Sequence, residues 1–412
     1  MKFLHLADMH LGKMLCGASL TENGDQAFYL ERLIGLIDRE KPDAVVIAGD
    51  VYDRGVPPKE AVTLLGGFLY ALAGSERGIP VLMIAGNHDG GERLNFAKEL
   101  LAGQNVHISG TAERTLTSVT LNTDGESVTF WLMPYVFPMK VRDLFSLTAE
   151  DVPDYESAVR VLLEHQDIDT SRRNVLIAHQ FVTAGQNVPV QSDSESAVGG
   201  LGAVDHSVFD AFDYVALGHI HSAQHIGRTS VRYAGAPLCY HFSEIGQKKG
   251  ALMVTLGAKG TEPEYELFEL PVLHNMRRIT GKFDDIIERE RHSSARGEYI
   301  SAVITDGDIV FDAAEQLRAL LESHGSKLLE ISFQPEGGYA GGDCGFTDGL
   351  HEKSMPELFG EFFEARCGRA MDAMERELIE NAAHSIGSGE DAGAEELADR
   401  LVRLAMEQEE EK

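Results

Sequence analysis

The chain has 412 residues, which is long enough for about two or three domains. Hydrophobic residues make up 43% of it and charged residues 25%, a globular composition that excludes a fully disordered chain. Asp and Glu total 66 against 36 Lys and Arg, so the net charge of −30 argues against DNA binding through a broad basic face.

The first half of the chain alternates strand-like and helical stretches. Short apolar, β-branched runs predict strands, and apolar residues at helical spacing predict helices. Strands are expected at residues 2–7, 43–48 and 79–85, and helices at about 24–39, 59–73 and 92–101. This alternation is typical of an α/β fold in which helices cover a parallel or mixed sheet.

After residue 105 the pattern changes to a series of strands interrupted by one helical stretch. These strands are expected at residues 114–121, 127–132, 174–178, 213–217, 230–233, 251–256 and 264–268. We expect the last three to complete a second sheet. Residues 1–270 would then form a two-sheet sandwich flanked by helices.

A second unit begins near Pro271 with the order β-α-β-α-β, which predicts a small α+β domain over residues 271–335. A Gly-rich linker (336–350), two amphipathic helices (within 351–386) and an acidic tail with a last helix (387–412) follow. The apolar stripe on these helices predicts a partner-binding surface because it lies beyond a linker. Its residues are Met355, Leu358, Phe359, Phe362 and Phe363.

No apolar run is long enough to span a bilayer, and polar residues interrupt the N-terminal segment, so neither a membrane span nor a signal peptide is expected. The four cysteines are far apart and form no C-x-x-C pair, which is typical of a reducing compartment. We therefore expect a soluble cytoplasmic protein with no membrane partner.

Five short polar motifs each stand where a strand is expected to end. They are Asp8-Met9-His10, Gly49-Asp50, Gly86-Asn87-His88-Asp89, Ala178-His179 and Gly218-His219-Ile220-His221. Ligands bind at the carboxyl ends of strands in α/β sheets, so we expect the motifs to converge in space. Each motif alone is also compatible with ordinary turn chemistry, but turns give no reason for all five to occur in order.

The motifs offer carboxylates, imidazoles and an amide, without thiolates. Such donors suit Mn²⁺, Fe²⁺ or Zn²⁺ and argue against a closed structural zinc site. The candidate ligands are Asp8, His10, Asp50, Asn87, His179, His219 and His221. They are too many for one ion but suit two ions that share a carboxylate, the arrangement with which phosphatases and nucleases polarise a phosphoryl group and generate hydroxide.

The series D-x-H, G-D, G-N-H-D, H and G-H-x-H resembles the motif set of the calcineurin-like binuclear metallophosphoesterases. Within that superfamily, DMHLGK, AGDVYDRGVPP, SESAVGG, FDYVALGHIH and YAGAPLCYHFSE are similar to the SbcD family, the nuclease subunits of bacterial SbcCD complexes. The resemblance covers residues 1 to about 383. It implies a metallophosphoesterase nuclease domain (1–270), a capping domain (271–335) and partner-binding helices (351–386).

Position by position, the resemblance implies two divalent metal ions, of which Mn²⁺ is the expected species. One ion would be held by Asp8, His10, Asp50 and His221. The second would be held by Asp50, Asn87, His179 and His219, with Asp50 as the bridge. His88 is similar to the family's catalytic histidine, which stabilises or protonates the leaving 3′ oxygen while hydroxide attacks the phosphorus in line.

Three neighbouring residues have less defined roles. Asp53 and Asp89 are expected to orient the imidazoles from outside the metal site. Arg54 lies in a D-R-G string that resembles the phosphate-contacting string of protein serine/threonine phosphatases. For Arg54 we favour a local structural role or a contact with the substrate backbone.

The resemblance implies a Mn²⁺-dependent DNA nuclease subunit, with 3′→5′ exonuclease activity on duplex ends and endonuclease activity on single strands and hairpins. It also implies an SbcC-type ATPase partner and a two-plus-two assembly built on a nuclease homodimer, acting in DNA repair, replication and recombination. The acidic charge is compatible with DNA if the ATPase grips the duplex and dimerisation gathers the few basic residues into one groove.

Two alternatives stay open at this point. A phosphoprotein or small-molecule phosphoesterase would use the same metals, but protein phosphatases of this class carry Glu after Asn-His, where this chain has Asp89. A non-catalytic scaffold would have lost part of the ligand set, which is complete here. The additional unit beyond Pro271 also favours a nuclease.

Overall fold

The computed structural model describes residues 1–74, 76–123, 126–195, 202–307, 310 and 312–334, and positions 360, 369, 371, 376 and 379. By compactness the chain divides into Met1–Glu336 and Gly337–Lys412. Apart from the five isolated positions, the predicted linker, partner-binding helices and acidic tail lie outside the described residues. So do the five apolar residues of the predicted partner surface, Met355, Leu358, Phe359, Phe362 and Phe363.

The first large sheet has six strands, with β1 inside it. In spatial order they are β16 (Glu264–Glu269), β15 (Gly250–Thr255), β1 (Lys2–Leu6), β4 (Ala44–Ala48), β5 (Val81–Ile84) and β6 (Val106–Ser109). The last four run parallel, and β15 and β16 are antiparallel to their neighbours. Every residue of β4 is buried, as expected for a parallel strand covered on both faces.

The second large sheet also has six strands and is parallel in its middle. In spatial order they are β13 (Gln224–Ile226), β14 (Arg228–Tyr233), β12 (Tyr214–Gly218), β9 (Arg173–His179), β8 (Glu126–Met133) and β7 (Thr117–Thr123). The four inner strands run parallel, and the two edge strands are antiparallel. The predicted strand at 230–233 lies in this sheet, as β14.

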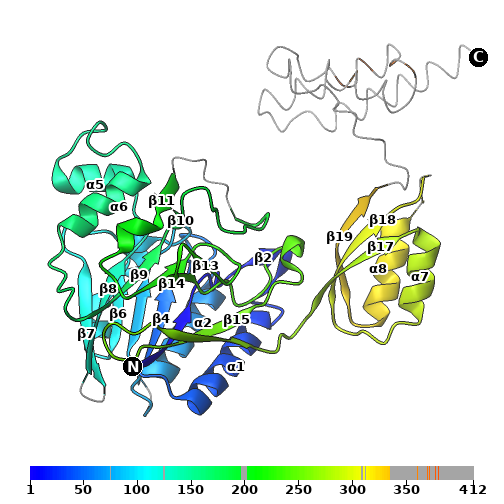
Figure 1. Ribbon diagram of the computed structural model, residues 1–412. Helices are drawn as coiled ribbons and strands as arrows, with labels where there is room; N and C mark the ends of the chain where they lie inside the picture. The colour runs from blue at the N-terminus through cyan, green and yellow to red at the C-terminus, as the bar shows by residue number, and fades with distance from the viewer. Residues whose placement is uncertain are drawn as a thin grey trace, which may run out of the picture. The chain divides into compact units, whose positions relative to one another are not determined.

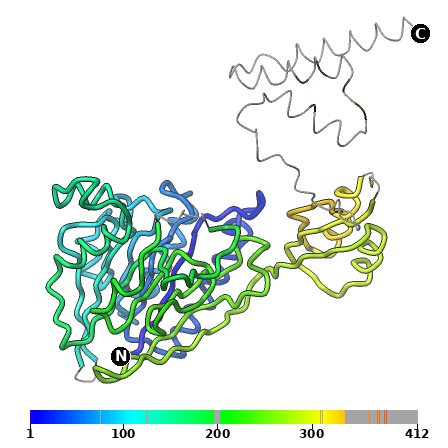
Figure 2. Tube along the Cα trace, turned by 45° about the horizontal axis from the view of Figure 1, so that its top comes forward, coloured from blue at the N-terminus to red at the C-terminus, as the bar shows by residue number. Residues whose placement is uncertain are grey.

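The predicted strands at 251–256 and 264–268 belong to the first sheet, not to the second as expected. They form β15 and β16, and β15 pairs with β1 so that Phe3 lies opposite Val254, which sets the first strand of residues 1–270 beside one of the last (Figure 2). The physical reason is the open edge of β1. Without β15, that edge would leave a row of backbone N–H and C=O groups unpaired in a buried strand.

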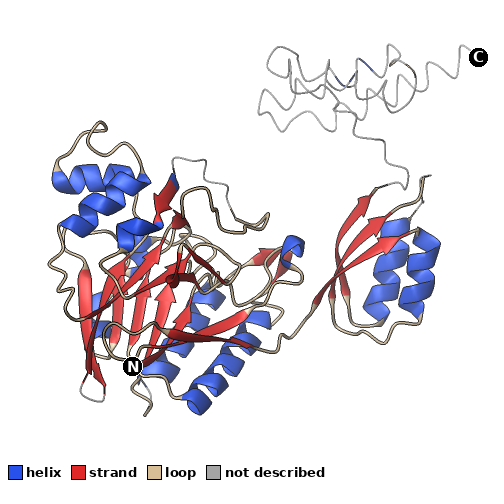
Figure 3. Ribbon diagram, viewed as in Figure 1, coloured by secondary structure: helices blue, strands red, loops and turns tan. Residues whose placement is uncertain are grey.

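The sandwich has four layers, with helices outside both sheets (Figures 1 and 3). On β1, Leu4 and Leu6 face the helix layer with Leu33 of α1 (Asp25–Glu40). Phe3, on the opposite face, packs against Phe130 of the second sheet with ring centroids 5.4 Å apart. Because side chains alternate along a strand, one short run supplies two cores. The predicted two-sheet α/β sandwich is confirmed.

The remaining helices of the sandwich are shorter. They are α2 (Lys59–Leu69), a π-helical turn (Tyr70–Gly74), α3 (Gly91–Leu94), α4 (Lys98–Ala102), α5 (Pro138–Phe145) and α6 (Tyr155–Glu164). The helix predicted over 92–101 is broken in two, because Ala97 has a left-handed backbone with φ of 60°. Asn95 stabilises the break by accepting a hydrogen bond from the Gly110 N–H at 2.8 Å. Among the described helices, none is both long and apolar enough to cross a bilayer.

Several elements are too short for sequence periodicity to reveal. They are β2 (Met14–Leu15), β3 (Ala18–Ser19), β10 (Phe181–Thr183), β11 (Ala203–Asp205) and the 3₁₀ turns His206–Phe209 and Phe242–Glu244. The sequence pattern also does not predict β6 or β13. β2 pairs with β3 and β10 pairs with β11 as two small ribbons. The 3₁₀ turn at 242–244 matters most for function, because it carries a buried carboxylate described below.

A third, smaller sheet follows the sandwich in the order that the sequence predicts. Its elements are β17 (Met276–Gly281), α7 (Phe283–Arg291), β18 (Tyr299–Ile304), α8 (Ala313–Ser323) and β19 (Lys327–Phe333). The three strands are parallel with β18 in the centre, and both helices lie on one face of the sheet (Figure 1). Ile279, Ile286, Ile300 and Leu317 share a separate hydrophobic core.

Candidate metal centre

The five polar motifs meet where strands of both sheets end. The first sheet supplies Asp8 and His10 after β1, Asp50 after β4 and Asn87 after β5; the second supplies His179 at the end of β9 and His219 and His221 after β12. Backbone hydrogen bonds align the first two loops, since the His10 N–H donates to the Asp50 carbonyl at 2.9 Å. The centre is therefore formed jointly by the two sheets.

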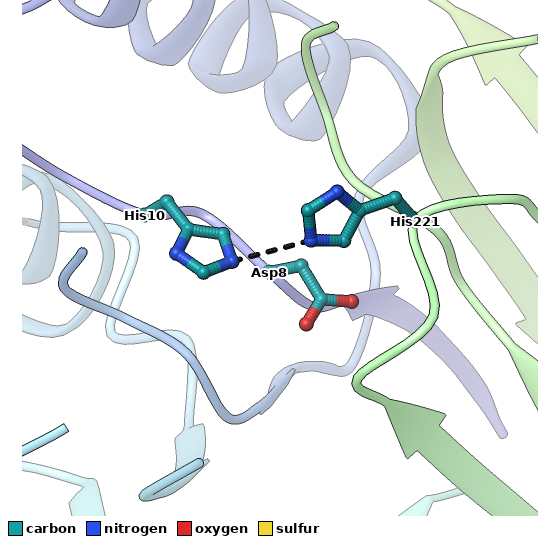
Figure 4. A group of neighbouring side chains, drawn as sticks. All are labelled: Asp8, His10 and His221. Carbon is teal, nitrogen blue, oxygen red and sulfur yellow. Dashed lines mark hydrogen bonds between the residues drawn. The ribbon is translucent and has the colours of Figure 1, made fainter. Parts of the chain in front are cut away.

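Asp8, His10 and His221 form one group of neighbouring ligand atoms (Figure 4). The Nε2 atoms of His10 and His221 lie 3.3 Å apart, and the Asp8 carboxylate lies beside them. Asp8 also accepts a hydrogen bond from the His219 N–H at 2.9 Å, which ties the loop after β1 to the loop after β12. All three side chains are buried.

Asp50, Asn87, His179 and His219 form the adjoining group. His179 Nε2 lies 3.1 Å from Asn87 Oδ1 and 3.3 Å from Asp50 Oδ2. His219 Nδ1 lies 3.1 Å from the same Asn87 oxygen. Asp50 Oδ2 is also 3.6 Å from His10 Nε2, so this one carboxylate contacts both groups.

Partners outside the centre decide which histidine nitrogens face it. His179 Nδ1 lies 2.8 Å from the Ala48 carbonyl oxygen, which can only accept, so Nδ1 carries a proton and Nε2 faces the centre. Glu244 has the same effect on His221, because its Oε1 lies 3.0 Å from Nδ1. Both rings therefore direct Nε2, the nitrogen available for a metal ion, toward the neighbouring ligands.

Two buried acceptor atoms of the centre, Asp8 Oδ2 and His219 Nε2, have no hydrogen-bond partner in the described part of the chain. Buried polar atoms in native proteins are nearly always paired. Clustered carboxylate, amide and imidazole donors prefer divalent ions such as Mn²⁺, Fe²⁺ or Zn²⁺. The residues of the centre therefore fit divalent cations.

Burial and neighbouring charges shift the pKa values of these groups apart. Burial raises the pKa of Asp8 to about 7, although His179 and His221 lower it. Burial would also raise the pKa of Asp50, but His179 and His10 hold it well below its usual value. Burial lowers the pKa of His179, yet Asp50 raises it to about 9. A metal ion bound at His179 would have to displace the proton at its Nε2, so metal affinity would weaken as the pH falls.

Much of the backbone that carries the side chains of the centre is left-handed. Asp8, His10, Asp50 and His219 have φ values of 52°, 41°, 47° and 99°, which residues other than glycine seldom adopt. At Gly86, a Cβ atom would lie 2.1 Å from Asp50 Oδ1, so no side chain fits there. Strain of this kind persists where the surroundings enforce it and is common at functional sites.

His88 lies beside the two groups and is half-buried. Its ring packs edge-on against His10 with centroids 4.8 Å apart, and its Nδ1 lies 3.0 Å from the Asp53 carbonyl oxygen. The His88 N–H donates to Asp50 Oδ1 at 2.9 Å. Asp53 Oδ1 lies 3.5 Å from His10 Nδ1 and 2.8 Å from Lys13 Nζ. Asp53 thus contacts an imidazole, as its expected orienting role requires.

Asp89 has backbone amides as partners in place of the expected imidazole. Its Oδ2 accepts hydrogen bonds from the Val51 and Gly86 N–H groups at 3.0 and 2.9 Å, and Oδ1 accepts from Tyr52 N–H at 2.8 Å. These bonds tie the loop after β4 to the loop after β5. Arg54 lies in the loop after β4, with an exposed side chain.

Sequence reasoning missed the residues that surround His221. Glu244 is fully buried, and its carboxylate accepts hydrogen bonds from Ser194 Oγ at 2.6 Å and Lys249 Nζ at 2.7 Å in addition to its contact with His221. Glu195 Oε1 accepts from the His221 N–H at 2.6 Å. The SESAVGG and YHFSE strings resemble the family, but nothing in their spacing connects them to a histidine.

Comparisons with known proteins agree with this geometry. Residues 1–223 match the family described as calcineurin-like phosphoesterase, and residues 272–366 match the family described as type 5 capsule protein repressor C-terminal domain. A curated relative from Staphylococcus epidermidis, the SbcD subunit of nuclease SbcCD, is 33% identical over 325 residues, which are 78% of this chain and 83% of the relative.

Solved structures are more distant. Yfce, a phosphoesterase from E. coli, is 13% identical, with 62% of this chain and 88% of that chain covered and a TM-score of 0.25. GAP50, an anchor in the inner membrane complex of Plasmodium, is 14% identical, with 82% and 98% covered and a TM-score of 0.33. At these TM-scores the likeness carries no argument.

The sequence matches decide the family. The phosphoesterase match spans the whole series of polar motifs, from the loop after β1 to the loop after β12. The identity with the staphylococcal SbcD extends over most of both chains. This chain belongs to the SbcD family of calcineurin-like phosphoesterases.

Proposed function

We propose that this chain is a metal-dependent DNA nuclease subunit that acts with an SbcC-type ATPase in DNA end processing, repair, replication and recombination. The observation that carries the proposal is the convergence of carboxylate, amide and imidazole donors from both sheets, in a chain 33% identical to the SbcD subunit of a nuclease SbcCD. The reaction is phosphodiester hydrolysis. Its expected forms are 3′→5′ exonuclease activity on duplex ends and endonuclease activity on single strands and hairpins.

We further propose that the centre holds two ions, most readily Mn²⁺. One ion would be held by Asp8, His10, Asp50 and His221. The other would be held by Asp50, Asn87, His179 and His219. The contacts of Asp50 with both His10 and His179 support its role as the bridge.

When bound, the cations would polarise the scissile phosphodiester and supply a hydroxide nucleophile. We propose that His88 serves the leaving 3′ oxygen. Its Nδ1 donates to the Asp53 carbonyl oxygen, so its other nitrogen, Nε2, remains to hold and deliver a proton. Asp53 would support His10 through Nδ1, and Asp89 would hold the loops after β4 and β5 together. Arg54, whose side chain is exposed, would have a local structural role or contact the substrate backbone.

A phosphoprotein or small-molecule phosphoesterase is the competing function within the same superfamily. Cleavage of a DNA hairpin oligonucleotide is compared with release of phosphate from a phosphopeptide, with and without Mn²⁺ and the ATPase subunit. We expect Mn²⁺-dependent hairpin cleavage, increased by the ATPase. Phosphopeptide turnover without hairpin cleavage would contradict the proposal.

Replacing His88 by Asn separates catalysis from metal binding. We expect the His88→Asn variant to lose cleavage while it retains the metal content of the unchanged protein, because His88 is proposed to act on the leaving group. Metal content is measured by elemental analysis after Mn²⁺ loading. Equal loss of metal would make His88 a ligand.

The division of the chain remains part of the proposal. Residues 1–270 would form the nuclease domain, 271–335 the capping domain, 336–350 a linker, 351–386 the ATPase-binding helices and 387–412 an acidic tail. The ATPase would supply most of the DNA affinity, since the chain carries a net charge of −30. We place the complex in the cytoplasm.

An apolar groove supports a homodimer within a two-plus-two assembly. The groove encloses about 1210 Å³ between α2 and the α3–α4 segment. Val62, Tyr70 and Phe96 line it with exposed fractions of 48%, 69% and 81%. Clustered exposed apolar side chains are typical of protein interfaces.

Analytical sedimentation, which measures the mass of the particle in solution, tests this dimer. The Phe96→Glu variant should sediment as a monomer. The Phe333→Glu variant, which alters an exposed Phe of β19, should remain a dimer.

A further inference from the structure

We propose that Tyr135 and Phe137 form a nucleobase-stacking subsite beside the metal centre, which holds the base next to the cleaved phosphodiester. The inference rests on the proposed nuclease function and goes beyond it by naming a substrate-binding surface. Both residues lie between β8 and α5, in the segment Pro134-Tyr135-Val136-Phe137-Pro138. None of the polar motifs lies in this segment.

Tyr135 contacts two residues of the centre directly. Its ring centroid lies 6.1 Å from that of His179 and 6.3 Å from that of His219. Its N–H donates to the Ala85 carbonyl at 2.9 Å, immediately before the loop that carries Asn87. Tyr135 is therefore fixed against the site where the scissile phosphate would bind.

Phe137 extends this row of rings outward. Its ring packs edge-on against Tyr135, with centroids 4.7 Å apart and an interplanar angle of 71°. The Phe137 side chain is 49% exposed. It is thus two ring contacts from His219, through the 4.7 Å and 6.3 Å centroid distances on either side of Tyr135, and still open to solvent.

The residues around Phe137 hold its backbone in place. Val136 and Val141, on either side of it, are fully buried. Pro138 begins α5 and restricts the backbone before it. A single exposed Phe is common on protein surfaces and alone means little. Here the ring is held in place and connected to the metal centre through Tyr135, so its position is well defined.

A nucleobase is the ligand class that fits these rings. Aromatic side chains bind single-stranded bases by stacking, with little sequence preference, and this contribution does not require positive charge. A chain with a net charge of −30 has little electrostatic affinity for DNA, so stacking offers it a separate source of affinity close to the reaction. Bases of single strands and opened hairpins are free to stack in this way.

The test uses the full chain with its ATPase partner and Mn²⁺, and compares two oligonucleotides. One carries an intact base next to a single cleavable phosphodiester, and the other has an abasic nucleotide there. We expect Phe137→Ala to raise KM for the intact oligonucleotide roughly 5- to 100-fold with little change in kcat, and to have no effect on the abasic one. Phe137→Trp should restore the KM, and the matched control Phe333→Ala, which alters a Phe that is 53% exposed on β19, should change neither.

The outcomes separate this inference from the function on which it rests. If the unchanged protein cleaves DNA and Phe137→Ala does not alter KM, or alters it equally for both oligonucleotides, the stacking subsite is wrong and the nuclease function stands. If the unchanged protein cleaves no DNA, both are wrong. Binding can also be measured without turnover, with 2-aminopurine in place of the base at the same position. Its fluorescence should fall when the oligonucleotide binds the His88→Asn variant. It should stay high with the double variant His88→Asn, Phe137→Ala.

Discussion

At the scale of single residues, Glu244 shows how a buried charge is stabilised next to the metal centre. Burial raises its pKa, but hydrogen bonds from His221 and the charge of Lys249 lower it far below its usual range. The Tyr240 N–H and Ser194 Oγ bind the same carboxylate. A charged group with this many partners is tolerated in a protein interior, whereas removal of one partner is costly.

We expect Glu244→Gln to weaken Mn²⁺ binding about 10- to 100-fold, because carboxylates that hold a ligating histidine from outside contribute in this range. The amide keeps the size of the side chain but loses the charge that fixes the proton on Nδ1 of His221. Isothermal titration with Mn²⁺ measures the change. Glu269→Gln on β16, which alters an exposed carboxylate, is the control. Equal Mn²⁺ affinity in both variants would show that Glu244 does not contribute to metal binding.

His5 gives a prediction for pH at the same scale. It is fully buried between the sheets, with Nδ1 3.1 Å from Tyr214 Oη and Nε2 3.2 Å from the Leu217 carbonyl oxygen. Burial lowers its pKa to about 3. In the unfolded chain the pKa returns to about 6.5, so between these values the unfolded state binds the proton more readily. The stability associated with neutral His5 is therefore complete above pH 6.5 and is lost as the pH falls toward 3.

Urea unfolding at several pH values checks this. The free energy of unfolding should fall with decreasing pH less steeply in His5→Asn than in the unchanged protein, by at most about 1.4 kcal/mol per pH unit. The slope is compared between proteins because the substitution also alters packing. The matched control is His165→Asn, which changes an exposed histidine. Equal slopes in all three proteins would show that His5 does not titrate on unfolding.

At the scale of elements, Arg173 connects the second sheet to the first. It begins β9 in the second sheet and donates to the carbonyls of Gly257, Ala258 and Thr261, in the connection between β15 and β16 of the first sheet. It also pairs with Asp213 at 3.3 Å. Its side chain is 4% exposed, so these acceptors have little access to water.

Arg173→Met should lower the free energy of unfolding by roughly 2 kcal/mol, because it removes the side-chain donor to the Gly257, Ala258 and Thr261 carbonyl oxygens. Asp213 loses one of its cationic partners but keeps Lys259 at 2.9 Å. The neighbouring Arg172→Met is the matched control. That side chain is 67% exposed, and its partner Asp169 at 3.2 Å is 56% exposed, so the loss of this surface pair should cost less than about 1 kcal/mol. Thermal or urea unfolding of both variants decides the point, and similar costs would contradict it.

At the scale of the whole molecule, the metal centre connects two sheets that also meet through apolar packing and through the polar contacts of His5 and Arg173. Asp8, His10, Asp50 and Asn87 come from the first sheet, and His179, His219 and His221 from the second. A cation bound by both sets stabilises only the folded chain, because the unfolded chain does not hold the ligands together.

Mn²⁺ should therefore raise Tm in a concentration-dependent way, and EDTA should lower it again. At 100 times the dissociation constant, the added stability is about 2.7 kcal/mol for each site. Scanning calorimetry measures the shift. Asp50→Asn should abolish most of it, since Asp50 contacts both ligand groups. A full Mn²⁺-dependent shift in that variant would contradict the proposed bridge.

How much of the site was predictable differs from residue to residue. The proposed ligands follow apolar runs that end as strands, and the carboxyl ends of parallel strands meet, so their convergence was predictable. The directions of the His219 and His221 side chains were harder to predict. Strand periodicity fixes side-chain directions only along a regular strand, and these two residues lie in the loop after β12. The left-handed backbone at His219, with φ of 99°, is what the sequence could not indicate.

Local pattern alone determined the alternation of strands and helices, the β-α-β-α-β order after Pro271 and the series of polar motifs, because these depend on spacing within a few residues. Only the tertiary structure decided that β15 and β16 complete the first sheet and that Glu244 supports His221. The reason is the same in both cases. Both outcomes depend on how distant segments pack, and local spacing carries no record of that. Packing decides which strand edge is left open, and it decides which carboxylate lies next to a histidine 23 positions away.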